Sequence, residues 1–125
     1  NDVHFLGWLN QKELSFCLRN SHIGLAPYSK DALMSLPNKF FEYLAYGLPI
    51  ISSLNSEMKI LIKNKKLGYY YKSESPESLA KAIISLEKNF KNELFHNSIK
   101  KEFDENFDGK KIYKKFAKFT ESILK

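Results

Sequence analysis

The strongest constraint on the fold is a regular alternation of short apolar stretches with amphipathic segments of about ten residues. Apolar stretches at residues 3–7, 23–27, 49–52 and 68–71 predict short strands. Helical spacing of apolar residues follows each stretch, and it continues from about residue 91 to the end of the chain. Strands that alternate with helices form parallel βαβ units. The sequence therefore predicts an α/β fold with a parallel sheet and C-terminal helices.

Signals at the element ends support this pattern. Asn10 precedes a helical segment, with Glu13 in the spacing of a capping box. Gly47 stands where a later helix stops, as a left-handed C-cap requires, and Ser75 followed by Pro76 is typical of a helix start. The residues expected to form apolar helix faces share helical spacing within their segments: Leu14, Cys17 and Leu18; Phe40, Phe41, Leu44 and Ala45; Met58, Leu61 and Ile62; Leu79, Ile83, Leu86 and Phe90; Ile112, Phe116, Phe119 and Ile123.

Length and composition limit the class of protein. The 125 residues fit one domain or part of one, and a hydrophobic content of 43% excludes global disorder. The single cysteine, Cys17, excludes an internal disulfide, and no apolar run reaches the roughly 18 residues of a membrane span. No secretory signal is present, which predicts a cytoplasmic location. The chain starts at Asn1, close to a predicted strand, so we expect a piece of a longer protein.

The net charge of +6 lies entirely in the second half of the chain. Residues 1–62 carry five basic and five acidic side chains, whereas residues 63–125 carry fifteen basic and nine acidic ones. A nucleic-acid binder concentrates such charge with aromatic residues on one face, but here the lysines are interleaved with glutamates through helical patterns. We therefore expect no nucleic-acid partner. A solvated helical surface is the main interpretation, and contact with anionic lipid headgroups or an anionic acceptor is the alternative.

Two loops are candidate ligand sites, because ligands of parallel sheets bind where strands lead into helix N-termini. Residues 7–10 connect a predicted strand to a capped helix, and residues 28–37 lead into the helix at 38–46. Free backbone N–H groups at that second helix suit a phosphate, Lys39 adds a cation, and Glu42 lies one turn later, on the face that could meet a ribose. The sequence contains no GxGxxG, P-loop, DxD or HExxH motif, so it indicates no metal site.

The stretches VHFLG, HIGLAP and LPNKFFEYLAYGLPIIS, in this order, resemble the donor-binding C-terminal domain of GT-B glycosyltransferases. The most similar family is glycosyltransferase family 4 (group 1), within it the bacterial enzymes of lipopolysaccharide and capsule synthesis. The resemblance covers about residues 2–90 and implies an incomplete Rossmann-like domain at residues 1–90, followed by a helical tail at residues 91–125. In the family's strand order, a further strand separates the two predicted at 3–7 and 23–27.

The resemblance also implies roles for individual residues. Glu42 matches the second glutamate of the family's E-x7-E motif, which holds the ribose hydroxyls, while the first glutamate falls at Met34. Leu9, after Gly7 and Trp8, matches the residue whose backbone meets the base. The loop and helix start that cradle the diphosphate are occupied by Ser35, Leu36, Pro37, Asn38 and Lys39.

By the same resemblance, the reaction is a retaining transfer of a sugar from a nucleotide diphosphate donor, without a bound metal or other cofactor. UDP and GDP both remain open as the nucleotide. The acceptor, a glycan or a lipid-linked sugar, would be met by an N-terminal domain outside these residues, together with peripheral contact at the inner membrane face. We therefore expect no catalytic residue in this chain and no transfer activity from it alone.

Two other functions remain open, and so does the oligomeric state. A sugar-nucleotide epimerase would keep the GT-B fold with different chemistry. A non-catalytic nucleotide-binding or interaction module with a flavodoxin-like fold would bind partners through its C-terminal helices. Unpaired strand edges would also favour a homodimer of this chain.

Overall fold

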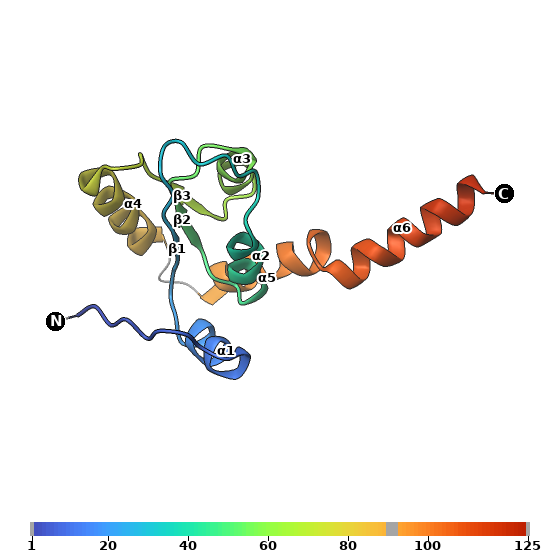
Figure 1. Ribbon diagram of the computed structural model, residues 1–125, viewed down its shortest axis with the longest axis horizontal. Helices are drawn as coiled ribbons and strands as arrows, with labels where there is room; N and C mark the ends of the chain where they lie inside the picture. Colours follow the sequence, from blue (N-terminus) through green and yellow to red (C-terminus); the bar gives the residue numbers. More distant parts are fainter. Residues whose placement is uncertain (1, 90–92, 125) are drawn as a thin grey trace.

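The computed structural model describes residues 2–89 and 93–124. It contains a three-stranded parallel sheet in the order β1-β2-β3, with β1 at Gly24–Ala26, β2 at Ile50–Ser52 and β3 at Gly68–Tyr70 (Figure 1). Parallel strands need crossover connections, and helices supply them here. The predicted α/β class with a Rossmann-like parallel sheet is confirmed. The helices of the described residues are α1 at Gln11–Arg19, α2 at Asn38–Ala45, α3 at Glu57–Asn64, α4 at Pro76–Asn89, α5 at Glu93–Asn106 and α6 at Gly109–Ile123.

Both faces of the sheet are covered, as the near-continuous apolar run of β2 requires. Successive strand residues point to opposite faces, so Ile50 and Ile51 belong to different apolar clusters. The Ile50 cluster joins residues of α2, α3 and α5, and the Ile51 cluster includes Leu86 of α4. Accordingly, α4 lies on one side of the sheet and α2 and α3 on the other (Figure 1).

Local capping signals are confirmed where the structure forms helices. The Asn10 side chain accepts hydrogen bonds from the N–H groups of Lys12 and Glu13, and the Glu13 carboxylate accepts one from the Asn10 N–H, at 2.8 Å. Gly47 has a φ of +69° directly after the C-cap of α2, a conformation that favours glycine. The Ser75 hydroxyl accepts from the Ser78 N–H at 3.2 Å at the start of α4.

The prediction of a strand at residues 3–7 is wrong for this structure. Val3, Phe5 and Trp8 are 70%, 97% and 97% exposed, and no strand of the described residues pairs with the segment. A strand is stable only when a neighbouring strand satisfies its backbone N–H and C=O groups. An apolar pattern at residues 3–7 does not supply that neighbour, so the segment runs without secondary structure to α1.

Some predicted apolar stripes are rotated from the buried faces. On α4 the buried residues are Ala82 and Leu86, while Ile83 is exposed. Ala82 and Leu86 belong to the Ile51 cluster, with Leu79 packed against it, so the buried face of α4 does not include Ile83. On α1 only Leu18 is buried; Cys17 is half-buried, and Leu14 is exposed. Phe90, the last residue of the predicted α4 stripe, lies outside the described residues.

The two C-terminal helices differ in their packing. Ile99 of α5 is buried in the Ile50 cluster, with Phe95, Phe103 and Phe107 packed against it. The Phe107 ring meets the Phe40 ring edge-to-face at 5.7 Å. By contrast, α6 extends away from the body of the molecule and buries none of its residues (Figure 1). The predicted boundary between residues 90 and 91 lies outside the described residues.

Candidate functional site

The carboxyl edge of the sheet is formed by the segments that follow the three strands. The longest is the loop at residues 27–37, which connects β1 to α2 and contains Ser35, Leu36 and Pro37. The segment at residues 53–56 leads from β2 to α3, and the segment at residues 71–75 leads from β3 to α4. Because the strands are parallel, these three segments meet at one edge.

Serine side chains fasten the beginning of the long loop to this edge. The Ser53 hydroxyl accepts a hydrogen bond from the Tyr28 N–H and donates one to the Tyr28 carbonyl oxygen, both at 2.8 Å. The Ser73 hydroxyl donates to the same carbonyl oxygen, also at 2.8 Å. The main chain of Tyr28 is therefore tied to the segments after β2 and β3 together.

A second set of hydrogen bonds fastens the end of the loop to α3. The Ser56 hydroxyl donates to the Ser35 carbonyl oxygen at 2.7 Å and accepts from the Met58 N–H at 3.3 Å, so it caps α3 while holding the loop. The Ser35 hydroxyl in turn donates to Oε2 of Glu57 at 2.8 Å. Both ends of the loop are thus held in place ahead of α2.

The N-terminus of α2 is open. Pro37 is its N-cap and provides no side-chain hydrogen bond. In the first turn, the Phe40 N–H donates to the Pro37 carbonyl oxygen at 3.0 Å. Within the described ranges, the N–H groups of Asn38 and Lys39 have no acceptor. Unpaired N–H groups and the positive end of the helix dipole attract anions. The exposed Lys39 side chain adds a positive charge at the same helix end.

Glu42 lies one turn further along α2. Its carboxylate is exposed and has no hydrogen-bond or ion-pair partner in the part of the chain that the structure describes. The neighbouring Tyr43 donates its hydroxyl to the Leu25 carbonyl oxygen at 3.0 Å. Burial raises the pKa of Tyr43 above its usual value, and the negative charge of Glu42 and the nearby Tyr28 raise it further. Burial likewise raises the pKa of Tyr28.

Residues 7–9 lie elsewhere. They precede α1, which contacts the far end of α2: Tyr46 donates its hydroxyl to Ser15 at 2.9 Å, and the Arg19 guanidinium lies 5.9 Å from the Tyr46 ring centroid. Because α2 starts at the carboxyl edge and Tyr46 is its C-cap, α1 and its preceding residues are at the opposite edge (Figure 1). The structure brings together the predicted site residues 35–39 and Glu42. It does not bring Gly7, Trp8 and Leu9 to them.

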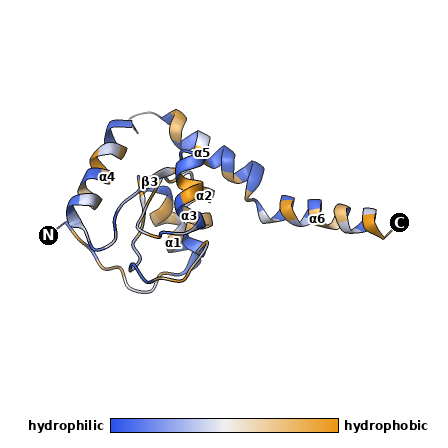
Figure 2. Ribbon diagram, turned by 90° about the horizontal axis from the view of Figure 1, so that it is seen from above, coloured by the Kyte–Doolittle hydropathy of each residue, from blue (hydrophilic) through white to orange (hydrophobic). Residues whose placement is uncertain are grey.

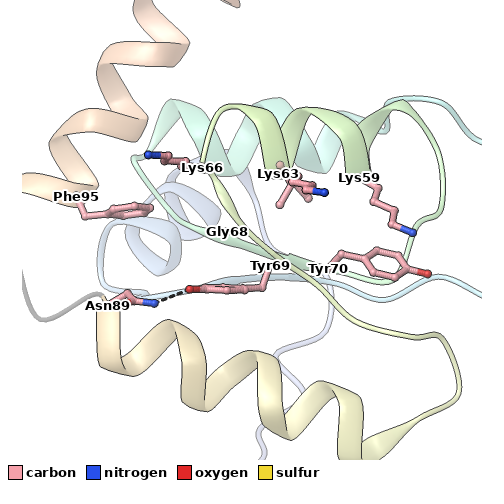
Figure 3. Close-up of a pocket in the computed structure, with 9 residues that line it drawn as sticks. Lys59, Lys63, Lys66, Gly68, Tyr69, Tyr70, Asn89 and Phe95 are labelled. Carbon is pink, nitrogen blue, oxygen red and sulfur yellow. Dashed lines mark hydrogen bonds between the residues drawn. The ribbon is translucent and has the colours of Figure 1, made fainter.

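A cavity of about 590 Å³ opens at a different place, beside β3 and between α3 and α4 (Figure 3). Lys59 and Lys63 of α3 line it, together with Lys66 in the turn that follows α3. The Lys59 Nζ lies 4.0 Å from the centroid of the Tyr70 ring. Across the cavity, Asn89 donates a hydrogen bond to the Tyr69 hydroxyl. None of the residues predicted to bind a donor lines this cavity.

A comparison with known protein families identifies the family of the chain. The family described as "Glycosyl transferases group 1" matches residues 1–89, which include the whole sheet, α2 and the long loop. The chain belongs to this family. No curated protein and no solved structure matches it. The match confirms the resemblance to group 1 glycosyltransferases and the glycosyltransferase type of function.

Two further properties of this glycosyltransferase chain concern metals and membranes. Among residues 2–89 and 93–124, no group of three or more His, Cys, Asp and Glu side chains is arranged to hold a metal ion. None of the helices in those ranges combines the length and the apolar character that crossing a bilayer requires.

The sequence analysis did not identify several residues that position the long loop at the carboxyl edge of the sheet. Ser53, Ser73 and Glu57 carry the hydrogen bonds that position the loop, but none was a candidate. Ser53 had a signal: it is a polar residue that directly follows the buried strand β2. Ser73 and Glu57 had none, because their partners are 45 and 22 residues away in the sequence.

Proposed function

We propose that this chain is the donor-binding portion of a retaining glycosyltransferase. It would serve the transfer of a sugar from a UDP- or GDP-sugar to a glycan or lipid-linked acceptor in bacterial surface-polysaccharide synthesis. One observation carries the proposal: the open N-terminus of α2, with Lys39 and Glu42 exposed on it, lies at the carboxyl edge of the sheet within the region that matches the family. The proposal includes a cytoplasmic location.

The α2 geometry suits the diphosphate and the ribose of such a donor. The N–H groups of Asn38 and Lys39 would donate to the diphosphate oxygens, and the Lys39 ammonium would offset part of their charge. This arrangement requires no metal ion between the protein and the diphosphate. The loop that delivers these groups is already held by its serine hydrogen bonds, so little ordering would accompany binding.

Glu42 would hold the ribose. A carboxylate accepts hydrogen bonds from two neighbouring hydroxyls. The Glu42 carboxylate is exposed on the same helix as Lys39 and has no partner among residues 2–89 and 93–124. Residues 7–9 lie at the other edge of the sheet, so the proposal assigns the diphosphate and the ribose to α2 and no base contact to residues 7–9. The sugar acceptor would be bound outside this chain, and we expect no sugar transfer by these 125 residues alone.

Calorimetric titration of the chain with UDP and GDP, in the presence of a metal chelator, tests this proposal. Glu42→Ala should weaken binding of the preferred nucleotide about tenfold or more, which corresponds to ~1.4 kcal/mol. Glu87→Ala is the matched control, because Glu87 is an exposed glutamate near the far end of α4 and should leave affinity unchanged.

The outcomes distinguish a donor-binding function from a non-catalytic one. Binding of one nucleotide that depends on Glu42 supports the proposed donor site. Binding of neither nucleotide, or equal affinities for the wild-type chain and Glu42→Ala, contradicts it and favours a non-catalytic interaction module. Sugar transfer by the chain alone would contradict the expectation that catalysis needs a further domain.

A further inference from the structure

The cavity beside β3 opens onto the main chain of that strand. Three consecutive residues of β3 line it: Gly68, Tyr69 and Tyr70. Successive side chains of a strand point to opposite faces of a sheet, so a cavity over one face would not be lined by all three. Gly68 has no side chain and lines the cavity with its main chain. The cavity therefore runs along the edge of the sheet.

The edge of β3 that faces the cavity carries main-chain groups without a partner. Within residues 2–89 and 93–124, β2 is the one strand that pairs with β3. The Leu67 carbonyl oxygen accepts a 2.9 Å hydrogen bond from β2, and the Tyr71 N–H donates a 3.0 Å bond to β2. Because main-chain groups alternate in direction along a strand, Tyr69 also faces β2, and the groups of Gly68 and Tyr70 face away from it.

The space beside this edge suits one further strand. In two perpendicular views, α4 lies on one side of β3 and α3 on the other (Figures 1 and 2). Ile62 lines the cavity from α3, and Asn89 lines it from the end of α4. An added strand would lie about 4.8 Å from β3, between the two helices. The volume of about 590 Å³ is within the range of ligand-binding cavities.

The cavity wall carries positive charge. Lys59, Lys63 and Lys66 line it, and no Asp or Glu among the described residues does. Lys59 lies over the Tyr70 ring, whereas Lys63 and Lys66 have no ion-pair partner in the part of the chain that the structure describes. Figure 3 shows the three side chains in a row along α3 and the turn after it. An occupant with carboxylates would supply the missing counter-charges.

Charge and position decide between the possible occupants. A second copy that paired through its own β3 would bring two sets of lysines together, and like charges disfavour such an edge contact. The exposed segment at residues 3–8 of a second copy contains no acidic side chain. The further domain that we expect to bind the acceptor would meet the carboxyl edge where α2 begins, and the further strand implied by the family would join beyond β1. An acidic segment of another protein fits both the charge and the free edge.

We propose that the β3 edge binds an extended acidic segment of a partner protein, which adds a strand to the sheet. The main chain of the segment would pair with the outward-facing groups of Gly68 and Tyr70. Every second side chain, a glutamate or an aspartate, would meet the lysines on the α3 side, and the side chains between them would lie on the α4 side near Tyr69. This inference goes beyond the proposed function and does not depend on it, because it uses no residue of the proposed donor site.

Fluorescence anisotropy of the full chain with a labelled peptide tests the proposal. The probe is a peptide of about six residues, a common strand length, in which glutamate alternates with valine. The wild-type chain should bind the probe saturably, and higher salt should weaken the binding because it screens the lysine charges. The same peptide methylated on every main-chain nitrogen keeps its charge but cannot donate to β3. Its affinity should be about tenfold lower or less.

Two pairs of variants separate main-chain pairing from charge. Tyr70→Pro removes an N–H that faces the cavity and leaves the bonds to β2 in place, whereas Tyr70→Val removes the same ring but keeps the N–H. Tyr70→Pro should therefore bind the probe about tenfold more weakly than Tyr70→Val. Lys63→Glu with Lys66→Glu should lower the affinity about tenfold or more. Lys114→Glu with Lys115→Glu on α6 makes the same change in net charge and should leave the affinity unchanged.

Folding is checked by urea denaturation of each variant. Lys63 and Lys66 are exposed, so their substitution should leave the urea midpoint of the chain unchanged. If Tyr70→Pro does not fold, the methylated peptide still tests the main-chain pairing, because it needs no change in the protein.

The remaining outcomes overturn the proposal. Equal affinities for the methylated and unmethylated peptides would show a contact through charge alone. Unchanged binding by Lys63→Glu with Lys66→Glu would place the peptide elsewhere on the chain, and no binding of the probe by the wild-type chain would exclude an acidic strand. A dimer that disappears in Tyr70→Pro but not in Tyr70→Val would identify the occupant as a second copy. A longer chain with the acceptor-binding domain that no longer binds the probe would assign the edge to that domain.

Discussion

Replacing Ser53 by alanine should loosen the loop that leads to the candidate donor site. The Ser53 side chain is buried, with the residue 2% exposed, and its hydroxyl exchanges two 2.8 Å hydrogen bonds with the main chain of Tyr28. Alanine removes both bonds. The Tyr28 carbonyl oxygen keeps its bond from Ser73, but the Tyr28 N–H keeps no partner among the described residues.

The magnitude follows from which group is left unpaired. A buried donor without a partner costs about 1–3 kcal/mol. Tyr28 is only partly buried, so water reaches it in part, and we expect the free energy of unfolding to fall by about 1–2 kcal/mol. Ser73→Ala should cost less, about 0.5–1 kcal/mol, because the carbonyl oxygen of Tyr28 keeps the Ser53 hydroxyl. The double variant should lose more than the sum of the two, since that oxygen then loses both donors.

Urea denaturation of the wild-type chain, the two single variants and the double variant measures these differences. Ser122→Ala on the exposed helix α6 is the control and should stay within about 0.5 kcal/mol of the wild-type chain. A Ser53→Ala loss below about 0.5 kcal/mol, or strictly additive losses in the double variant, would refute the reasoning that both serines share the Tyr28 carbonyl. Hydrogen exchange should also quicken in residues 28–37 of Ser53→Ala, because opening of this loop becomes easier.

Other predictions concern the sheet, pH and association. Gly68→Ala should prevent β3 from pairing with β2, because a Cβ at Gly68 would lie 1.9 Å from the Ile50 carbonyl oxygen. Circular dichroism and urea denaturation should therefore show a largely unfolded chain. A urea midpoint like that of the wild-type chain would contradict this. The pKa of Tyr43 is raised above 10.0 in the folded state, so the unfolded state loses its proton first, and stability should be lost as the pH rises above about 10. Urea midpoints measured across that pH range should fall less steeply in Tyr43→Phe, and an unchanged slope would argue against the assignment. The apolar segment at residues 3–8 pairs with no strand of the described chain, so we expect self-association, which light scattering would detect. A monomeric mass at high concentration would count against it.

The elements that local chemistry determines could be predicted from the sequence. A helix begins after Asn10 and another after Ser75, because these side chains accept hydrogen bonds from free N–H groups of the first turn. Pro76 adds a φ that already suits the first helical position. Neither effect depends on where the helix packs. Gly47 ends α2 because few other residues adopt its backbone angle. The segment at residues 3–7 shows the limit: its pattern favours a strand, but pairing depends on a distant neighbour that the pattern does not contain.

The candidate site also contains some residues that could be predicted from the sequence and some that could not. The open N-terminus of α2, Lys39 and Glu42 could be found because helix position and residue type are visible in the sequence. The position of Ser53 directly after β2 is also visible in the sequence. The support that Ser73 and Glu57 give to the loop could not be predicted, because they act across long sequence separations. Residues 7–9 were placed with α2 because a strand was predicted at residues 3–7 and because of the resemblance. That strand does not form among the described residues, and the packing of α1 on Tyr46 puts residues 7–9 at the other edge.

The packing of α5 means that the region matching the family is shorter than the region that forms the apolar core. The family match ends at residue 89, yet Ile99 and Phe107 complete the apolar cluster around Phe40 and Ile50. A chain ended at residue 89 would keep every matched position and expose one side of its own core to water. We therefore expect a piece that ends at about residue 107 to be more stable than one that ends at residue 89, although the added residues lie beyond the family match.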